Sequence, residues 1–169
     1  MAISMYAAST PVFIKALTAL TAILDKTASH AADKKIDPTV LLQSRLFPNM
    51  FTLTRQIQVS CDFAKGACAR LAGVENPKYE DQEQSLADLQ ARISKTIAFI
   101  QTIPAEKING SEERAISVPA GPERILDFVG QDYLLNFALP NFYFHVTAAY
   151  AILRHNGVEL SKGDYLGGI

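Results

Sequence analysis

The feature that most constrains the fold is a long run of apolar residues at helical spacing in the middle of the chain. Within this run, apolar residues recur every three or four positions and so fall on one side of a helix. Gly73 follows the run and is a typical residue for the turn that ends a helix. Such a helix must bury its apolar side, which favours a helical bundle. The apolar positions are Met50, Leu53, Ile57, Cys61, Ala64, Cys68 and Leu71.

Three other stretches carry helical patterns, and together with the first they predict four helices. Pro11 is expected to bend the first helix or to mark where it effectively begins. The second opens with Asp37 and Pro38, an N-cap acid followed by proline, and Pro48 breaks or kinks it before the apolar run. Pro140 is expected to kink the last helix. The predicted helices cover residues 4–28, 38–71, 85–100 and 131–156.

Two short stretches between the third and fourth helices have a different character. Ala115–Val118 and Ile125–Val129 favour β structure and flank a Pro-Ala-Gly-Pro turn, so we expect a small hairpin there. The third helix begins at Ser85 with the capping-box pattern Ser-x-x-Asp. The chain is therefore predicted to be all-α, a single domain over residues 1–169. Its predicted fold is an antiparallel four-helix bundle with a small β-hairpin before the last helix.

Charge and hydropathy exclude two classes of partner. The formal net charge is −1 over 169 residues, so the chain lacks the basic excess that binding to nucleic-acid phosphates requires. Leu134 to Leu153 contains no Asp, Glu, Lys or Arg, but Pro140 and Asn141 interrupt its apolar character. We interpret this stretch as the central helix of a bundle, or as one covered by a second subunit, rather than as a membrane span. We expect neither nucleic acid nor a membrane as a partner.

The two cysteines are predicted to be structural. Cys61 and Cys68 lie seven residues apart on one predicted helix. That spacing separates them by roughly 10 Å along the axis, beyond the ~7 Å between Cα atoms that a disulfide spans. Both project to the apolar side, where a free cysteine behaves as a small buried hydrophobe. A reducing, cytoplasmic compartment is the natural expectation.

The last helix holds two of the three histidines, His145 and His155. Ten residues separate them by about 15 Å along the helix and about 80° around it, so they cannot ligate one ion together. Neither has a histidine four positions away, which is the spacing of a zinc-binding helix. His145 is then a hydrogen-bonded core residue, a member of a ligand pocket, or a metal ligand with partners from elsewhere. We predict no metal site and no cofactor.

Two polar stripes are the other candidate features. The stripe on the last helix comprises Asn136, Tyr143, Thr147, Tyr150 and Arg154. It could form a subunit interface, line a pocket for a carboxylate-bearing molecule, or face solvent. The stripe on the second helix comprises Arg55, Gln58, Asp62 and Lys65. It is expected to be a solvated face with pairing along the helix, and it could complete a pocket only if it faced the last helix.

Several stretches resemble a known bacterial family. "MFTLTRQIQVSCDFAKGACARLAG", "GQDYLLNFALPNFYFHVTAAYAILRHNGVELSKGDYLG" and the Lys-Ile-Asp-Pro start of the second helix are similar to domain of unknown function 1993. The resemblance spans nearly the whole chain. It implies a fold of the DinB/YfiT-like four-helix superfamily, which includes metal-dependent hydrolases and transferases that use small thiols.

The resemblance also implies where a metal site would lie. Metal-binding members of the superfamily supply one histidine from the second helix and a pair four residues apart near the end of the last. His155, in "RHNGVEL", resembles the second histidine of that pair and is interpreted as a remnant of the metal site. The first position of the pair is Ala151, and residues 38–71 contain no histidine. A metal-dependent activity therefore does not carry over to this chain.

The sequence supports two hypotheses of different classes. The first is an uncharacterised cytoplasmic bundle without the metal-binding histidine triad, which forms a homodimer and binds a small polar molecule or a protein partner. The second is an enzyme, a thiol-cofactor-dependent transferase or isomerase with His145 or His155 as acid/base. Whether the protein is an enzyme stays open, and no catalytic residue is assigned. The candidate ligand pocket comprises Asn141, Tyr143, His145, Tyr150 and Arg154.

Overall fold

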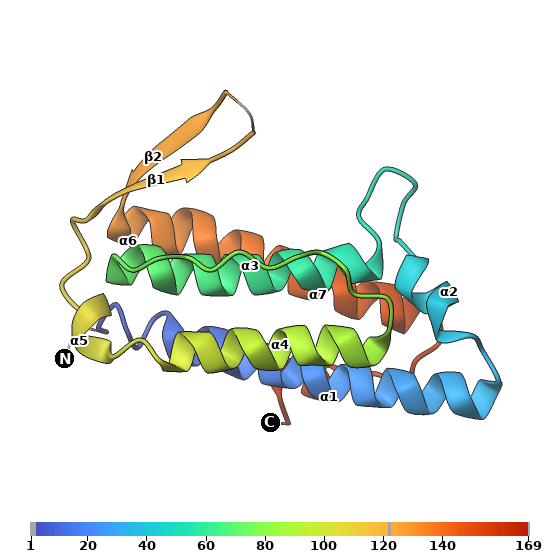
Figure 1. Ribbon diagram of the computed structural model, residues 1–169. Helices are drawn as coiled ribbons and strands as arrows, with labels where there is room; N and C mark the ends of the chain where they lie inside the picture. Colours follow the sequence, from blue (N-terminus) through green and yellow to red (C-terminus); the bar gives the residue numbers. More distant parts are fainter. Residues whose placement is uncertain (1–2, 122, 169) are drawn as a thin grey trace.

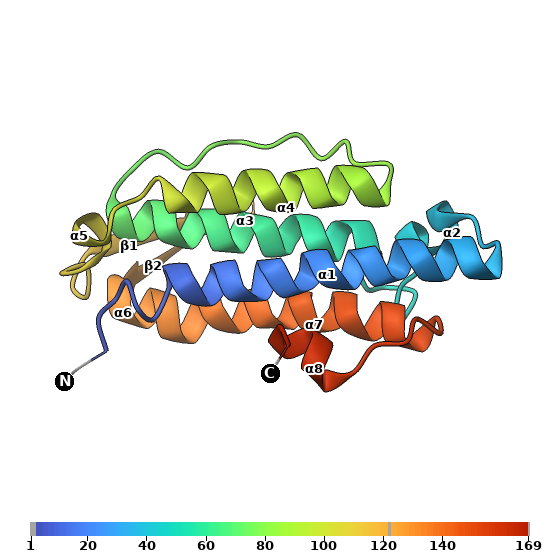
Figure 2. The same ribbon diagram turned by 90° about the horizontal axis from the view of Figure 1, so that it is seen from below.

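The protein is a bundle of four long helices with a protruding hairpin, described by a computed structural model over residues 3–121 and 123–168 (Figure 1). The helix α3 packs against α4 and α7, and α1 packs against the same two helices from the other side (Figure 2). The predicted all-α bundle is confirmed. The long helices are α1 (Thr10–Lys34), α3 (Leu53–Ala72), α4 (Leu86–Gln101) and α7 (Leu139–His155).

Two helices run in each direction, but not in simple alternation along the chain. In both views α1 and α7 run one way, whereas α3 and α4 run the other (Figures 1 and 2). The segment between α3 and α4 must therefore travel back along the bundle before α4 can begin. One long crossover connection of this kind is a known variant of four-helix bundles.

Local capping chemistry explains most of the helix boundaries. Pro11 lies in the first turn of α1, so it marks the start of that helix rather than a bend. The Thr52 side chain accepts a hydrogen bond from Arg55 N at the start of α3, and Gly73 ends α3 in a left-handed conformation with φ 66°. Ser85 forms the predicted capping box at the start of α4.

Two of the predicted helices differ from the observed ones. The first continues to Lys34, six residues beyond the expected end, and Lys35 then adopts a left-handed conformation that stops it. The predicted helix 38–71 is divided, because residues 44–52 are not helical and Pro48 lies among them. The short helix α2 (Pro38–Gln43) precedes this break, and α3 follows it.

The last helix is irregular where a kink at Pro140 was expected. It consists of α6 (Gly130–Asp132), the π-helical turn η1 (Tyr133–Ala138) and α7, without interruption. Pro140 has no N–H to donate to the helical ladder, and the residues before it widen into η1. The π-turn changes the direction in which the side chains around Tyr133 and Phe137 project, and both belong to the site described below.

The predicted hairpin is present at one end of the bundle (Figure 1). The strand β1 (Ala115–Pro119) pairs with β2 (Ile125–Val129) in antiparallel register, with Ser117 opposite Asp127. Of the predicted Pro-Ala-Gly-Pro turn, Pro122 lies outside the described residues. Ile116 and Val118 are buried against the bundle, so the hairpin has one inner and one outer face.

The central position of α3 determines where a site can form. Fourteen of its twenty residues are buried, so this helix is covered on nearly every side. Cys61 and Cys68 are among them and both are free, as expected. Two short helices complete the fold, α5 (Ala105–Ile108) after α4 and α8 (Lys162–Leu166), which lies on α1. Among the residues described, no helix combines the length and apolar character that a membrane span needs.

Candidate functional site

The crossover segment between α3 and α4, residues 74–84, is here called the strap. It has no regular secondary structure, and none of its residues is buried. It returns the chain along the bundle to the start of α4 (Figure 2), and it contacts Arg55, Gln58 and Lys65 on the polar side of α3. The polar stripe of α3 was expected to be solvated and paired along the helix. Arg55 contacts Gln58 and Lys65 contacts Asp62 as expected, but the strap covers part of the stripe. Lys65 is only 5% exposed, and Gln58 is buried as well.

A network of ion pairs centred on Arg92 of α4 holds the strap in place. The Arg92 side chain is only 2% exposed. Its Nη2 lies 3.0 Å from a carboxylate oxygen of Asp62 on α3 and 3.0 Å from one of Asp81 on the strap. Its Nη1 lies 2.9 Å from Glu83. Burial alone would raise the pKa of Glu83, but hydrogen bonds from Arg92 and Gln58 outweigh it and lower that pKa.

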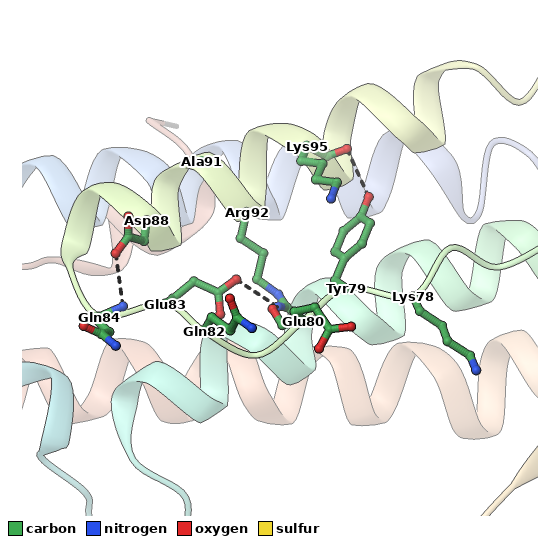
Figure 3. Close-up of a pocket in the computed structure, with 10 residues that line it drawn as sticks. All are labelled: Lys78, Tyr79, Glu80, Gln82, Glu83, Gln84, Asp88, Ala91, Arg92 and Lys95. Atoms are coloured by element: carbon green, nitrogen blue, oxygen red, sulfur yellow. Dashed lines mark hydrogen bonds and ion pairs between the residues drawn. The ribbon is translucent and has the colours of Figure 1, made fainter.

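The ring of Tyr79 is the second anchor of the strap. Three cationic groups lie over it, at 4.2 Å for Lys95, 4.9 Å for Lys65 and 5.5 Å for Arg92 from the ring centroid. Cations over an aromatic face are attracted by its quadrupole. The Tyr79 hydroxyl also donates to the backbone oxygen of Lys95 (Figure 3). Burial raises the pKa of Tyr79, so the phenol keeps its proton at neutral pH.

A cavity of about 600 Å³ opens beside the strap, where α3, the strap, β1 and η1 meet. We call it the hairpin cleft. Its walls are aromatic and apolar, and its polar groups come from α3 and the strap. Among its lining residues are Phe63, Lys65, Arg70, Asn76, Tyr133 and Phe137.

Two cations of α3 point toward this cleft. Lys65 Nζ lies 3.3 Å from Asp62 Oδ1 and donates to Asn76 Oδ1 at 3.4 Å. Arg70 Nη1 donates to the hydroxyl of Tyr133 at 3.2 Å. Burial raises the pKa of Tyr133 despite the charge of Arg70, so this hydroxyl is neutral. Among the described residues, no carboxylate forms an ion pair with Arg70.

A glycine in the middle of α3 makes the position of Arg70 feasible. A Cβ atom on Gly66 would lie 2.5 Å from Arg70 Nη1 and 3.4 Å from Asn76 Nδ2. Glycine in a helix interior costs roughly 0.5–1 kcal/mol relative to alanine. Here the missing side chain lets the guanidinium lie across the helix surface toward Tyr133.

The structure places His145 in the core between α3 and α7. Its Nδ1 lies 2.7 Å from Gln56 Oε1, and its ring is nearly parallel to those of Phe51 and Phe63. Burial, with a smaller contribution from the charge of Arg55, lowers the pKa of His145. The imidazole is therefore neutral at pH 7. This environment corresponds to the hydrogen-bonded core residue that the sequence allowed.

The other four residues of the candidate pocket lie at separate places. Asn141 donates to the backbone oxygen of Phe137. Tyr143 lines a shallow cavity of about 200 Å³ together with Tyr165 of α8. Tyr150 packs edge-on against the same Tyr165 ring, with centroids 5.6 Å apart. Arg154 is exposed near the end of α7. The structure thus brings the two tyrosines to α8 and leaves His145 facing α3.

The residues present do not fit the metal site of the superfamily. Within residues 3–121 and 123–168, no three His, Cys, Asp or Glu side chains are placed to hold an ion together. The α3 residue that meets His145 is Gln56, whose neutral amide is a weak ligand for zinc. His155 is exposed at the end of α7 with Ala151 one turn before it. The acid/base role suggested for His145 or His155 stays a prediction.

The sequence did not identify the residues that form the cleft as a group. Lys65 and Asp62 were recognised only as part of a polar stripe. One signal was available, because Gly66 interrupts an otherwise strong helix, and a glycine there often has a packing reason. Arg70, Asn76 and Tyr133 carry no local pattern that marks them.

Comparison with known proteins places the chain at the level of family and fold. Residues 5–166 match the model of the family described as Domain of unknown function (DUF1993). The crystal structure of a DinB family member protein from Shewanella denitrificans is similar, with a TM-score of 0.89 and 41% sequence identity. The match covers 97% of this chain and 92% of that chain. None of the curated proteins matches this chain.

Proposed function

This chain belongs to the DUF1993 family of DinB-like helical bundles, and from that premise we propose that it binds a small organic anion in the hairpin cleft. The observation that carries the proposal is the position of Arg70. This guanidinium lines the cleft, and its observed partner is the neutral hydroxyl of Tyr133. A planar guanidinium has donors to spare for a carboxylate, which it can bind through two parallel hydrogen bonds.

Lys65 adds a second positive group to the same wall. Its charge is shared with Asp62, but Asp62 is also paired with Arg92. Lys65 therefore keeps part of its capacity for an incoming anion. Because the ammonium is nearly excluded from water, its attraction for a carboxylate is screened less than at an exposed lysine.

The apolar side chains that line the cleft suit an apolar body on the ligand. Phe63 and Phe137 contact each other edge to face, with ring centroids 5.9 Å apart. Val118 and Pro119 of β1 extend this apolar wall. A cavity that combines a few convergent polar groups with an apolar lining is typical of small-molecule sites. A monocarboxylate with an aromatic or branched hydrocarbon body has a group for each kind of lining residue.

The test is calorimetric titration with benzoate and phenylacetate, with their uncharged amides as controls. The Arg70→Ala variant is expected to bind the carboxylates at least about tenfold more weakly, because a charge-assisted hydrogen bond contributes roughly 1.5–3 kcal/mol. Arg154→Ala tests the pocket predicted from the sequence. Weaker binding in Arg154→Ala but not in Arg70→Ala would move the site to α7. No binding of either carboxylate at millimolar concentration would contradict the proposal.

We also infer that the protein forms a homodimer, as predicted from the sequence. Supporting it are three phenylalanines at or near the α2–α3 connection and α7 that are each at least half exposed: Phe47, Phe51 and Phe144. Phe51 and Phe144 both lie beside the His145 ring, so they form part of one apolar surface. Exposed apolar surface of this kind is typical of protein contacts. Light scattering should give twice the monomer mass, and Phe144→Ser should lower it. A monomeric wild type would contradict this inference.

A further inference from the structure

Beyond Val74, which packs against the core where the strap begins, the strap is attached to the bundle by polar groups and by the ring of Tyr79. Its anchors are Asp81 and Glu83 on Arg92, Asn76 on Lys65, and the Tyr79 ring under its cations. No side chain of the strap is fully buried. Segments with few buried apolar contacts open at a lower free energy than the helices around them. The closed position of the strap therefore depends on its charges.

Arg92 and the backbone oxygen of Lys95 connect α4 to the strap, and beside these contacts a cavity of about 550 Å³ lies between the two. All but one of the residues that line it are polar (Figure 3). Lys78, Tyr79 and Glu80 line both this cavity and the hairpin cleft. The middle of the strap is thus a wall between two hollows, and lifting it would open the cleft along its full side.

From this geometry we propose that the strap is the gate of the hairpin cleft. It lifts as a unit when the ion network releases Asp81 and Glu83, and this movement exposes Lys65 and admits the ligand. The identity of the ligand that the gate admits rests on the function proposed above. The opening of the gate can be measured without a ligand. Asp81 is 43% exposed and also pairs with Arg55, so salt can screen its contacts. Opening should therefore increase with ionic strength.

Lysine labelling measures the opening directly. The probe is acetic anhydride at low concentration, and the modified lysines are quantified by mass spectrometry. Lys65 lies beneath the strap and is nearly inaccessible, so its labelling rate reports the open state. Lys78 is exposed and serves as the internal reference. In the wild type, the ratio of Lys65 to Lys78 labelling should rise severalfold between low salt and about 1 M NaCl, where the Debye length is about 3 Å.

Two matched variants test the anchor. Asp81→Asn removes a charge that pairs with Arg92 and Arg55, whereas Glu75→Gln removes an exposed charge of the strap that lines neither cavity and takes part in none of the ion pairs observed among the described residues. Asp81→Asn should raise the labelling of Lys65 about fivefold, which corresponds to about 1 kcal/mol. Glu75→Gln should leave it unchanged. Both changes are on the surface, so both proteins should fold.

The possible outcomes test the gate and the proposed ligand class independently. Equal labelling of Lys65 in the two variants, together with no effect of NaCl, would overturn the gate. If benzoate binds, its association rate should rise in Asp81→Asn but not in Glu75→Gln, and an equal rate in both would also contradict the gate. If benzoate does not bind while Lys65 responds as expected, the gate stands and the proposed ligand class is wrong.

Discussion

Replacing Gly66 by alanine should not stabilise the protein, although Gly→Ala in a helix interior normally does. Alanine gains roughly 0.5–1 kcal/mol there through lower chain entropy in the unfolded state. The new Cβ would lie 2.5 Å from Arg70 Nη1, which is too close for a stable contact. The guanidinium must therefore move, and it can do so because it is the end of a flexible side chain. The hydrogen bond to Tyr133 is then lost, at about 1–2 kcal/mol for a buried hydroxyl left unpaired. The net change should lie between zero and about 1.5 kcal/mol of destabilisation.

A double-mutant cycle separates the two effects. Urea unfolding of the wild type, Gly66→Ala, Arg70→Ala and the double variant gives the four free energies of unfolding that the cycle needs. With Arg70 removed, nothing flexible opposes the methyl group, so Gly66→Ala should then stabilise by close to 1 kcal/mol. The coupling between the two changes should be about 1–2 kcal/mol. Stabilisation by Gly66→Ala of equal size in both backgrounds would refute the role assigned to this glycine.

Three further results are expected. Histidine NMR should show His145 titrating below pH 6.5. The unfolded chain takes up that proton near 6.5, so this group lowers the free energy of unfolding as pH falls from 6.5 to the folded pKa. Burial raises the pKa of Cys61 and Cys68 to about 12, so a thiol reagent should label them in guanidinium but not in the native protein at neutral pH. Ser85→Ala should cost about 1 kcal/mol in urea unfolding through loss of the capping box, whereas the exposed Ser94→Ala on α4 should not.

Most helices and both strands could be predicted from the sequence because capping and turn residues act on their immediate neighbours. Pro11, Ser85 and Gly73 act within one helical turn of themselves, so their effects on helix ends can be recognised without the fold. The hairpin strands were predicted for the same reason, since a Pro-Gly turn between β-favouring residues is a local signal. The end of α1 was missed because no glycine or proline marks it, and Lys35 adopts the left-handed conformation instead.

The path of the strap could not be predicted from local patterns, although its length was informative. Residues 74–84 are longer than the two to eight residues that usually join neighbouring helices of a bundle. Fully extended, these eleven residues reach about 36 Å, whereas the sixteen residues of α4 rise about 24 Å. The segment is therefore long enough to return along α4. The residues that anchor the strap show no periodic spacing, because periodic spacing of side chains arises only in helices and strands.

The same limitation explains the burial of the polar stripe on α3. Arg55, Gln58, Asp62 and Lys65 have the spacing of a solvated helix face, and no property of α3 alone distinguishes that state from burial under a strap. The distinction lies in Arg92, which is thirty residues from Asp62 in sequence but 3.0 Å from it in space. Charges on three elements are needed before any of them can be buried at acceptable cost.

The two ends of α3 differ in whether they offer a free polar group to a ligand. Near its start, Gln56 contacts one ring nitrogen of His145, and the rings of Phe51 and Phe63 lie nearly parallel to the imidazole. A neutral imidazole held in this way has one ring nitrogen already occupied by a hydrogen bond to a neutral amide. Near the other end, about 21 Å away by helical rise, Arg70 meets a cavity with its charge unpaired among the described residues. An anion gains most from a cation that lacks a counter-charge, so under the function proposed above the cleft at Arg70, rather than the histidines, is where a ligand should stabilise this protein most.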